Sequence, residues 1–286
     1  MRILNASGCL DALTAPDVAR SLDAFVSKTV TPLPREGNAP VRIAETDVGM
    51  LNSIGLANPG RDAFIAKTLP QLRELGVPVW ISVGGFAAHE YAETCARLDD
   101  VTIELNLSCP NVEEAADTAA AIVAACRAVT NLPLYAKLSP ANWDISEVAR
   151  AVHVAGADGL SLVNTMRGTA LDEATLAPRL GTWSGGLSGP ALKPVVLAAV
   201  YACWSATRMP IVGMGGVMTG RDALELVAVG AQDVALGTVL FRDPEAPERV
   251  RAELAAEVAA LGVADVDDVR GVAHEGGVAS RLSLTL

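Results

Sequence analysis

The chain has 286 residues, 51% of them hydrophobic, which is enough for one large core or two small ones. It carries 22 Lys and Arg against 33 Asp and Glu and no basic cluster, so we expect no nucleic-acid partner. The five cysteines include no C-x-x-C pair, which excludes the common zinc and iron–sulfur spacings and fits a reducing cytosol. The longest apolar run, residues 195–204, is about half of a membrane span, and the first residues do not resemble a signal peptide. We therefore expect a cytoplasmic protein that makes no contact with a membrane.

Short β-branched runs alternate with longer alanine-rich segments of helical period, a pattern typical of parallel β/α units. The pattern predicts eight strands, over residues 3–6, 24–29, 78–83, 101–107, 134–138, 159–164, 211–214 and 233–236. Helices are predicted over residues 62–75, 87–97, 114–129, 144–155, 190–206, 220–229 and 245–261. Eight strands alternating with helices favour a TIM barrel over a doubly wound sheet.

Residues 32–60 are rich in Pro, Gly and Asn, and they predict a segment inserted above the barrel between the second and third strands. Nothing in the composition divides the chain into domains. We therefore expect one α/β domain over residues 1–286, a single (β/α)8 TIM barrel with a C-terminal cap at about 262–286.

In a barrel of this kind the chemistry lies at the carboxyl ends of the strands. The predicted ends are rich in Asn, Lys and Gly and nearly free of carboxylates. Sites for Mg²⁺ or Zn²⁺ need clusters of carboxylates or histidines, and none of the three histidines lies at a predicted strand end. We therefore expect no metal site.

The most informative segment is residues 103–112, where an apolar strand leads into a Cys-Pro turn that Asn106 and Asn111 bracket. Burying amides beside a thiol is costly unless they hold a ligand. Pro110 fixes the backbone beside Cys109, and an ordinary thiol pKa of about 8.5 is close enough to neutrality for general-base work. Cys109 is therefore the candidate base, whereas the other four cysteines are interpreted as small buried hydrophobes.

Lys137 lies within a predicted strand and is expected to point into the barrel mouth. A buried ammonium needs an anionic partner, because leaving it unpaired costs several kcal/mol. The neighbouring strand ends offer no carboxylate, so a bound ligand is the expected partner, with Glu104 as the alternative. Lys28 also needs an anionic partner, and a bound ligand is again the expected one.

Two glycine-containing turns, Gly215-Gly216 and Gly237-Thr238, occupy the positions of the standard phosphate site of a barrel. Glycine also suits tight turns, so these residues alone leave both interpretations open. The Gly/Ser-rich segment 184–190 opens a predicted helix and favours the phosphate site, since two such loops can wrap the tail of a phosphorylated cofactor.

The segment Asn-Leu-Ser-Cys-Pro-Asn (106–111) closely resembles the catalytic-loop motif of class 1 dihydroorotate dehydrogenases. The same resemblance extends, in chain order, through residues 6–9, 28–31, 44–46, 49–56, 137–140, 164–165, 185–190 and 213–217. Residues 50–56 are most similar to the NAD-linked subclass. In that subclass the FMN-containing catalytic subunit pairs with a subunit that carries FAD and an iron–sulfur cluster.

The resemblance implies FMN-dependent oxidation of dihydroorotate to orotate in the biosynthesis of UMP. Cys109 would take the C5 proton while the C6 hydride passes to flavin N5, and Lys137 would stabilise negative charge at the N1/O2 edge. The substrate would be bound by Lys28, Asn52, Asn106, Asn111, Asn164 and Thr165. The FMN would be held by Ala6, Ser7, Gly8, Lys28, Asn106, Lys137, Ser188, Gly189, Gly215, Gly216, Gly237 and Thr238. A homodimer is also implied, while the electron acceptor (NAD through a partner subunit, fumarate or a quinone) stays open.

The chain departs from the family pattern in two places that bear on function. A helix is predicted almost directly after Val112, where family members carry a longer mobile lid, and Ser82 stands where many have Asn. The shorter lid motivates one alternative, a flavin-binding homologue with impaired activity. Two further alternatives are a flavin reductase acting on another dihydropyrimidine or an activated alkene, and a non-redox barrel that binds a sugar phosphate.

Overall fold

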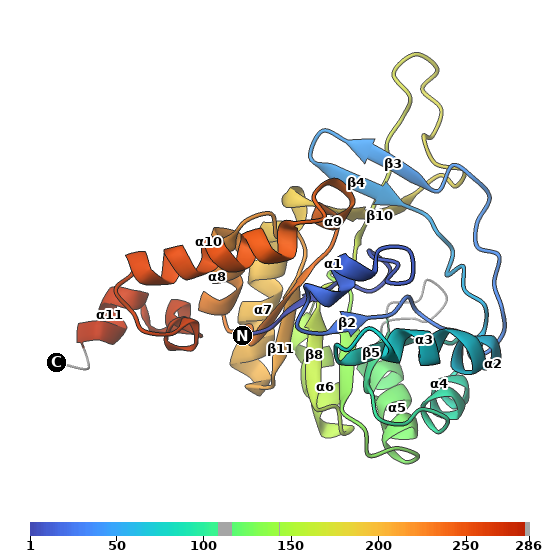
Figure 1. The fold of residues 1–286 in the computed structure, drawn as a ribbon, viewed down its shortest axis with the longest axis horizontal. Coiled ribbons are helices and arrows are strands. Elements are labelled where there is room, and N and C mark those ends of the chain that lie inside the picture. Colours follow the sequence, from blue (N-terminus) through green and yellow to red (C-terminus); the bar gives the residue numbers. More distant parts are fainter. Residues whose placement is uncertain (108–115, 143, 284–286) are drawn as a thin grey trace.

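Eight parallel strands form the central sheet of the computed structural model, which describes residues 1–107, 116–142 and 144–283 (Figure 1). Their order in the sheet is β1-β12-β11-β8-β7-β6-β5-β2. The strands are β1 (Ile3–Asn5), β2 (Phe25–Val26), β5 (Val79–Val83), β6 (Thr102–Asn106), β7 (Leu134–Leu138), β8 (Gly159–Leu162), β11 (Ile211–Met214) and β12 (Asp233–Leu236). All eight predicted strands are present, and the predicted TIM barrel is confirmed.

The edge strands β1 and β2 approach each other and nearly close the barrel. Leu4 and Ala24 form an isolated parallel bridge. The Asn5 side chain accepts a hydrogen bond from Val26 N at 2.8 Å and donates one to Val26 O at 2.8 Å. A buried side-chain amide thus supplies the hydrogen bonds that a backbone ladder makes elsewhere in the sheet.

Helices cover the outside of the barrel, and the predicted ones are found with small changes at their ends. They are α1 (Pro16–Arg20), α2 (Arg61–Ala63), α3 (Leu69–Arg73), α4 (Ala88–Cys95), α5 (Ala116–Arg127), α6 (Ile145–Val154), α7 (Lys193–Thr207), α8 (Gly220–Ala228), α9 (Val239–Arg242), α10 (Ala246–Ala260) and α11 (Val278–Ser283). The single helix predicted over 62–75 is instead α2 and α3 joined by a π-helical turn, Phe64–Thr68. Pro70 lacks a backbone N–H and removes one regular helical hydrogen bond there. The short helices α1 and α9 were not predicted.

Side-chain caps explain where two of the longer helices begin. Asp144 accepts a hydrogen bond from Glu147 N at 3.0 Å at the start of α6. Thr219 and Asp222 form a reciprocal capping box at the start of α8. Each cap satisfies backbone N–H groups that have no partner within the helix.

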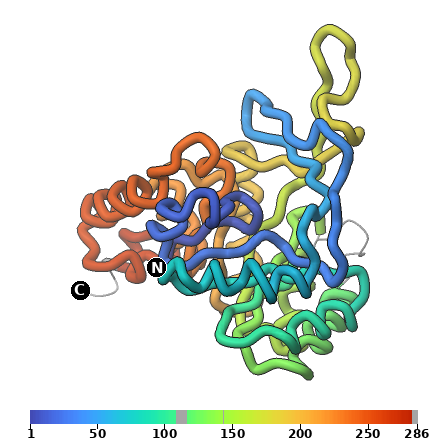
Figure 2. The backbone as a smooth tube through the Cα atoms, turned by 45° about the vertical axis from the view of Figure 1, so that its right-hand side comes forward, coloured from blue at the N-terminus to red at the C-terminus, as the bar shows by residue number. Residues whose placement is uncertain are grey.

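A second, four-stranded antiparallel sheet rises from the carboxyl end of the barrel (Figures 1 and 2). Its order is β3 (Ile43–Thr46), β4 (Gly49–Asn52), β10 (Gly185–Ser188) and β9 (Met166–Gly168). The predicted insertion at residues 32–60 supplies β3 and β4. The other two strands belong to a second excursion that follows β8, so the prediction of a single excursion was incomplete.

The amino end of the barrel is filled by an aromatic plug. The rings of Trp80 and Tyr135 lie 4.5 Å apart, and the Arg2 guanidinium lies over the Trp80 ring at 5.5 Å while its Nη2 pairs with Asp233 at 2.6 Å. A Cβ on Gly159 would lie 2.3 Å from the Tyr135 ring, so only glycine leaves room for the ring.

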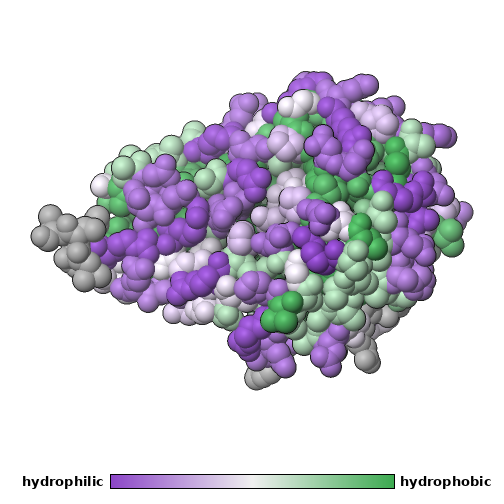
Figure 3. All heavy atoms as spheres, turned by 90° about the horizontal axis from the view of Figure 1, so that it is seen from below, coloured by the Kyte–Doolittle hydropathy of each residue, from purple (hydrophilic) through white to green (hydrophobic). Residues whose placement is uncertain are grey.

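Seen from below, the molecule shows hydrophilic side chains spread between smaller hydrophobic patches (Figure 3).

The C-terminal segment packs against α7 and α8. The His274 ring stacks on Tyr201 at 3.7 Å, lies 3.1 Å from Ser205 Oγ through Nδ1, and lies 3.0 Å from Val229 O through Nε2. The N-terminal amine lies 3.8 Å from Asp267, which brings the two ends of the described chain to the same side (Figure 2). Within the described ranges, every helix is too short or too polar to cross a membrane.

Candidate active site

A chain of hydrogen-bonded polar side chains crosses the carboxyl end of the barrel. Asn106, the last residue of β6, donates from Nδ2 to Thr29 Oγ1 at 3.1 Å, and this hydroxyl lies 2.9 Å from Ser82 Oγ. Asn164 follows β8 and donates from Nδ2 to Asn106 Oδ1 at 3.1 Å. Thr29, Ser82 and Asn106 are all buried. The buried Tyr91 of α4 donates to Asn106 O at 2.9 Å and so fixes the end of β6.

The second sheet extends this polar chain towards Asn52. Thr165 N donates to Asn164 Oδ1 at 2.8 Å, and a Cβ on Gly186 would lie 2.0 Å from Thr165 Oγ1. The Asn52 side chain donates to Gly186 O at 3.3 Å, which joins β4 to β10 at the same place. Four of the predicted substrate-binding residues therefore lie in one connected group: Asn106, Asn164 and Thr165 contact one another in sequence, and Asn52 joins them through Gly186.

Lys137 has a carboxylate partner inside the barrel. Its Nζ lies 3.3 Å from Glu104 Oε1, and the exposed fractions of the two residues are 5% and 1%. A bound ligand was the expected partner of Lys137, and the structure shows that the alternative partner, Glu104, pairs with it. Side chains alternate along β6, so Glu104 points into the barrel one layer below Asn106.

Lys28 and Cys9 lie together beside the turn after β1. A Cβ on Gly8 would lie 3.4 Å from Lys28 Nζ. Burial lowers the pKa of Lys28 from its usual value, an effect that the nearby Cys9 thiol partly opposes. Burial also raises the pKa of Cys9, although the charges of Lys137 and Lys28 act in the opposite direction. No carboxylate pairs with Lys28 among the residues that the structure describes, so the expectation of a ligand partner stands there as a prediction.

Cys9 is a residue of this site that the prediction missed. Its Sγ would lie 3.8 Å from a Cβ on Gly237, at the end of β12, and the same Cβ would lie 3.7 Å from Ala6 Cβ. Ser7 donates from Oγ to Ser27 O at 2.8 Å, which ties the same turn to the segment after β2. The sequence did contain a signal for this placement: Cys9 directly follows Ala6, Ser7 and Gly8, and a turn at the carboxyl end of a strand faces the mouth of a barrel.

Two of the predicted phosphate-site turns, those of Gly189 and Gly216, meet at the start of α7. Gly189 and Gly216 have φ angles of +108° and +76°, which residues with a side chain rarely adopt. A Cβ on Gly216 would lie 3.1 Å from Gly189 O and 2.9 Å from Lys193 N. Gly215 precedes this turn, and Ser188 donates to Met50 O at 3.3 Å. Gly237 and Thr238 lie between β12 and α9, beside Ala6 and Cys9, so their part in the phosphate site stays a prediction.

Asp222 fixes the turn that carries Gly215 and Gly216. Its carboxylate accepts hydrogen bonds from Met218 N, Thr219 N and Thr219 Oγ1, each at 2.9 Å. Lys193, at the start of α7, donates to the same carboxylate at 2.6 Å. Burial alone would raise the pKa of Asp222, but the hydrogen bonds from Lys193, Met218 and Thr219 outweigh it and leave the pKa below its usual value.

Two predicted site residues, Cys109 and Asn111, lie outside the described residues, as does the short connection to the next helix. Their positions relative to the polar chain stay predictions. In the part of the chain that the structure covers, no group of three or more His, Cys, Asp or Glu could hold a metal ion.

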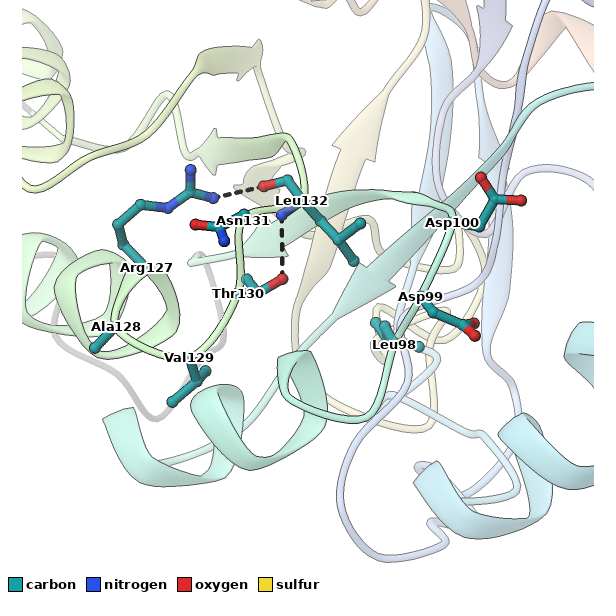
Figure 4. Close-up of a pocket in the computed structure, with 9 residues that line it drawn as sticks. All are labelled: Leu98, Asp99, Asp100, Arg127, Ala128, Val129, Thr130, Asn131 and Leu132. Carbon is teal, nitrogen blue, oxygen red and sulfur yellow. Dashed lines mark hydrogen bonds between the residues drawn. The ribbon is translucent and has the colours of Figure 1, made fainter.

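A pocket of about 540 Å³ lies at the other end of the barrel (Figure 4). Residues 98–100 and 127–132 line it, and these precede β6 and β7. Arg127 donates to Leu132 O at 2.5 Å across one side of it. The pocket is therefore at the amino ends of the strands and is separate from the polar chain.

The family model described as dihydroorotate dehydrogenase matches residues 2–258. This chain belongs to the dihydroorotate dehydrogenase family. It is 44% identical over 268 residues to a protein of Desulforudis audaxviator, covering 90% of this chain and 87% of that protein. It is 39% identical over 282 residues to a protein of Listeria monocytogenes, covering 94% and 93%. Both relatives are named dihydroorotate dehydrogenase B (NAD(+)), catalytic subunit.

The fold agrees with that assignment. A dihydroorotate dehydrogenase from Eimeria tenella, solved in complex with ferulenol, has a TM-score of 0.80 at 23% identity, covering 95% of this chain and 85% of that one. The resemblance to the class 1 family is confirmed. Dihydroorotate dehydrogenases are flavin-dependent oxidoreductases of pyrimidine biosynthesis that act on a CH–CH bond, and the chain is an enzyme of this kind.

Proposed function

We propose that the chain is an FMN-dependent catalytic subunit that oxidises dihydroorotate to orotate. The observation that carries the proposal is the buried polar chain from Asn164 through Asn106 to Thr29 and Ser82. Dihydroorotate is a neutral ring of amides with one carboxylate, so its recognition requires amide partners and a cation. Each Asn side chain offers two donors and two lone pairs, which matches the alternating donors and acceptors of the ring amides.

The described residues fit an FMN in the same mouth. The ribityl phosphate would be held at the turns that carry Gly189, Gly216 and Gly237, together with the neighbouring Ser188, Gly215 and Thr238. Ala6, Ser7 and Gly8, the small residues of the turn after β1, would lie against the ring, and Lys28 and Asn106 would make further contacts with it. Bound FMN supplies the hydride acceptor of the reaction.

The proposed substrate contacts come from Lys28, Asn52, Asn106, Asn111, Asn164 and Thr165, which bind the ring amides and the carboxylate. Lys137 stabilises the negative charge that gathers on the reduced cofactor, and its own charge is offset by Glu104. Cys109 takes the proton from C5, which is acidic because it adjoins a carbonyl, as the hydride leaves C6. A positioned base of this kind typically contributes on the order of 10²–10⁴-fold to the rate.

We propose the same partners that the relatives' names indicate. Those relatives are catalytic subunits of NAD(+)-linked enzymes, which implies a separate electron-transfer subunit. The five cysteines of this chain include no C-x-x-C pair, so the FAD and iron–sulfur relay would reside on that subunit. We also propose a homodimer, and a reducing cytoplasm as its compartment, since the described cysteines Cys9, Cys95, Cys126 and Cys203 are free.

Comparing dihydroorotate with dihydrouracil tests the proposed substrate. The purified protein is mixed with each compound without oxygen, and the rate of flavin reduction is followed. We expect rapid reduction by dihydroorotate and little by dihydrouracil, because dihydrouracil lacks the carboxylate that a cationic site binds. Reduction by dihydrouracil alone would replace the proposal with a different dihydropyrimidine reductase, and bound flavin that neither compound reduces would support an impaired homologue.

A further inference from the structure

The ion pair between Glu104 and Lys137 places a negative charge directly behind the cationic side of the site. Asn106 pairs with Lys137 in the register of β6 and β7, and Glu104 lies two residues earlier on β6. Residues two apart share one face of a strand and lie about 7 Å apart, so the backbone of Glu104 is one layer farther from the mouth than that of Lys137. Both side chains are buried, and their closest atoms are 3.3 Å apart.

Among the described residues, Glu104 is the one carboxylate that pairs with Lys137. The Cys9 thiol approaches from the turn after β1, with Lys28 beyond it, and both Lys28 and Lys137 act on that thiol. Ser161, level with Lys137 on β8, is neutral, and its hydroxyl has no partner among the described residues. Tyr135, two residues before Lys137, interacts instead with Arg2 and Asp233 at the amino end.

We propose that Glu104 is a positioning residue for the reaction, which holds the Lys137 side chain in place for the bound cofactor. A buried ammonium is costly without a counter-charge, and a paired carboxylate offsets that cost. Glu104 also offsets part of the positive charge that Lys137 and Lys28 present, and so limits how strongly the site favours the reduced, anionic cofactor. This inference rests on the proposed function.

The test is the midpoint potential of the bound FMN at pH 7 in wild-type protein and in Glu104→Gln. The variant lacks the carboxylate that opposes Lys137, so it should favour reduction on the order of tenfold more, which raises the midpoint potential by about 30 mV for two electrons.

Asp233→Asn is the matched control, because it also removes one buried carboxylate from an ion pair, but at the amino end of the barrel. Its potential should match that of wild type. Glu104→Asp keeps the charge one methylene farther back, so its potential should lie between those of wild type and Glu104→Gln, and it serves as the test if Glu104→Gln does not fold.

A potential in Glu104→Gln that equals or falls below that of wild type would overturn the role of Glu104 and leave the proposed function intact. Wild-type protein that binds no flavin would overturn the proposed function itself. The two failures are thus distinguishable in the first spectrum.

Discussion

Lys28 is half-buried, and burying its charged ammonium is costly. We therefore expect kcat/KM for dihydroorotate to depend on the protonation of Lys28. Burial lowers the pKa of Lys28, so this side chain becomes neutral at a lower pH than the usual lysine value of about 10.4. If Lys28 binds the substrate carboxylate, kcat/KM for dihydroorotate should fall as pH rises through that lowered pKa, and Lys28→Arg should remove the alkaline decline. An identical decline in the arginine variant would show that another group is responsible.

Lys137 is expected to act through its charge. Replacing it with Met keeps most of the side chain but removes the ammonium, so flavin reduction by dihydroorotate should slow by about 10²–10³-fold in stopped-flow experiments. Asp233→Asn serves as a comparison with unchanged chemistry, since Asp233 pairs with Arg2 outside the site. A Lys137→Met variant that reduces its flavin at the full rate would refute the assigned role.

Individual residues show how far sequence patterns reach. Asn106, Asn164 and Lys137 could be predicted because polar side chains at the ends of apolar strands stand out. The partner of Lys137 could not, since Glu104 lies within a strand and only the register between β6 and β7 brings it to 3.3 Å. Cys9 was assigned to the core for a related reason, because its neighbours Lys28 and Gly237 come from distant segments.

At the scale of an element, the turn between β11 and α8 depends on Asp222. Asp222→Asn should weaken FMN binding by roughly tenfold, because charge-assisted hydrogen bonds that contribute about 1.5–3 kcal/mol hold Met218, Thr219 and Lys193 in place. FMN affinity is measured by fluorescence. Glu225→Gln is the matched variant, since Glu225 also pairs with Lys193, at 3.0 Å, and it should retain normal affinity.

The Asp222 carboxylate should also determine how the turn between β11 and α8 responds to acid. A carboxylate with a depressed folded pKa stabilises the folded turn above its unfolded pKa of about 3.9 and loses that contribution as pH falls through the folded value. Wild-type protein should therefore keep its FMN at pH 5 and release it at lower pH, and Asp222→Asn should release it with a smaller dependence on pH in that range. Equal acid sensitivity in the two proteins would assign the release to other groups.

Among the elements, the barrel strands could be predicted because they are short apolar runs that alternate with longer helical segments. The strands of the second sheet could not. β9 and β10 are short and glycine-rich, and they become strands only by pairing with each other and with β4, which lies more than a hundred residues earlier. The periodicity of a short segment does not reveal pairing with a distant strand. Only the excursion at residues 32–60 was therefore predicted, from its Pro and Gly content.

At the scale of the whole molecule, stability and chemistry occupy opposite ends of the barrel. Trp80 is 2% exposed and packs on Tyr135 at the amino end, so Trp80→Ala should lower the free energy of unfolding by about 3–5 kcal/mol. Thermal unfolding should show a drop in Tm of about 10 °C. Trp183→Ala, at a position that is 65% exposed, should change stability by less than about 0.5 kcal/mol. Both variants should keep the wild-type flavin spectrum, and a Trp80→Ala protein that has lost its flavin while folded would contradict this separation.

The most direct test of the account is the visible spectrum of the purified protein without oxygen, before and after dihydroorotate is added. We expect a flavin band that bleaches at once in the wild-type protein. In Cys109→Ala the same band should bleach more slowly by orders of magnitude, because that variant binds flavin but lacks the proposed base. A wild-type band that dihydroorotate leaves unchanged would contradict the proposed oxidation of dihydroorotate.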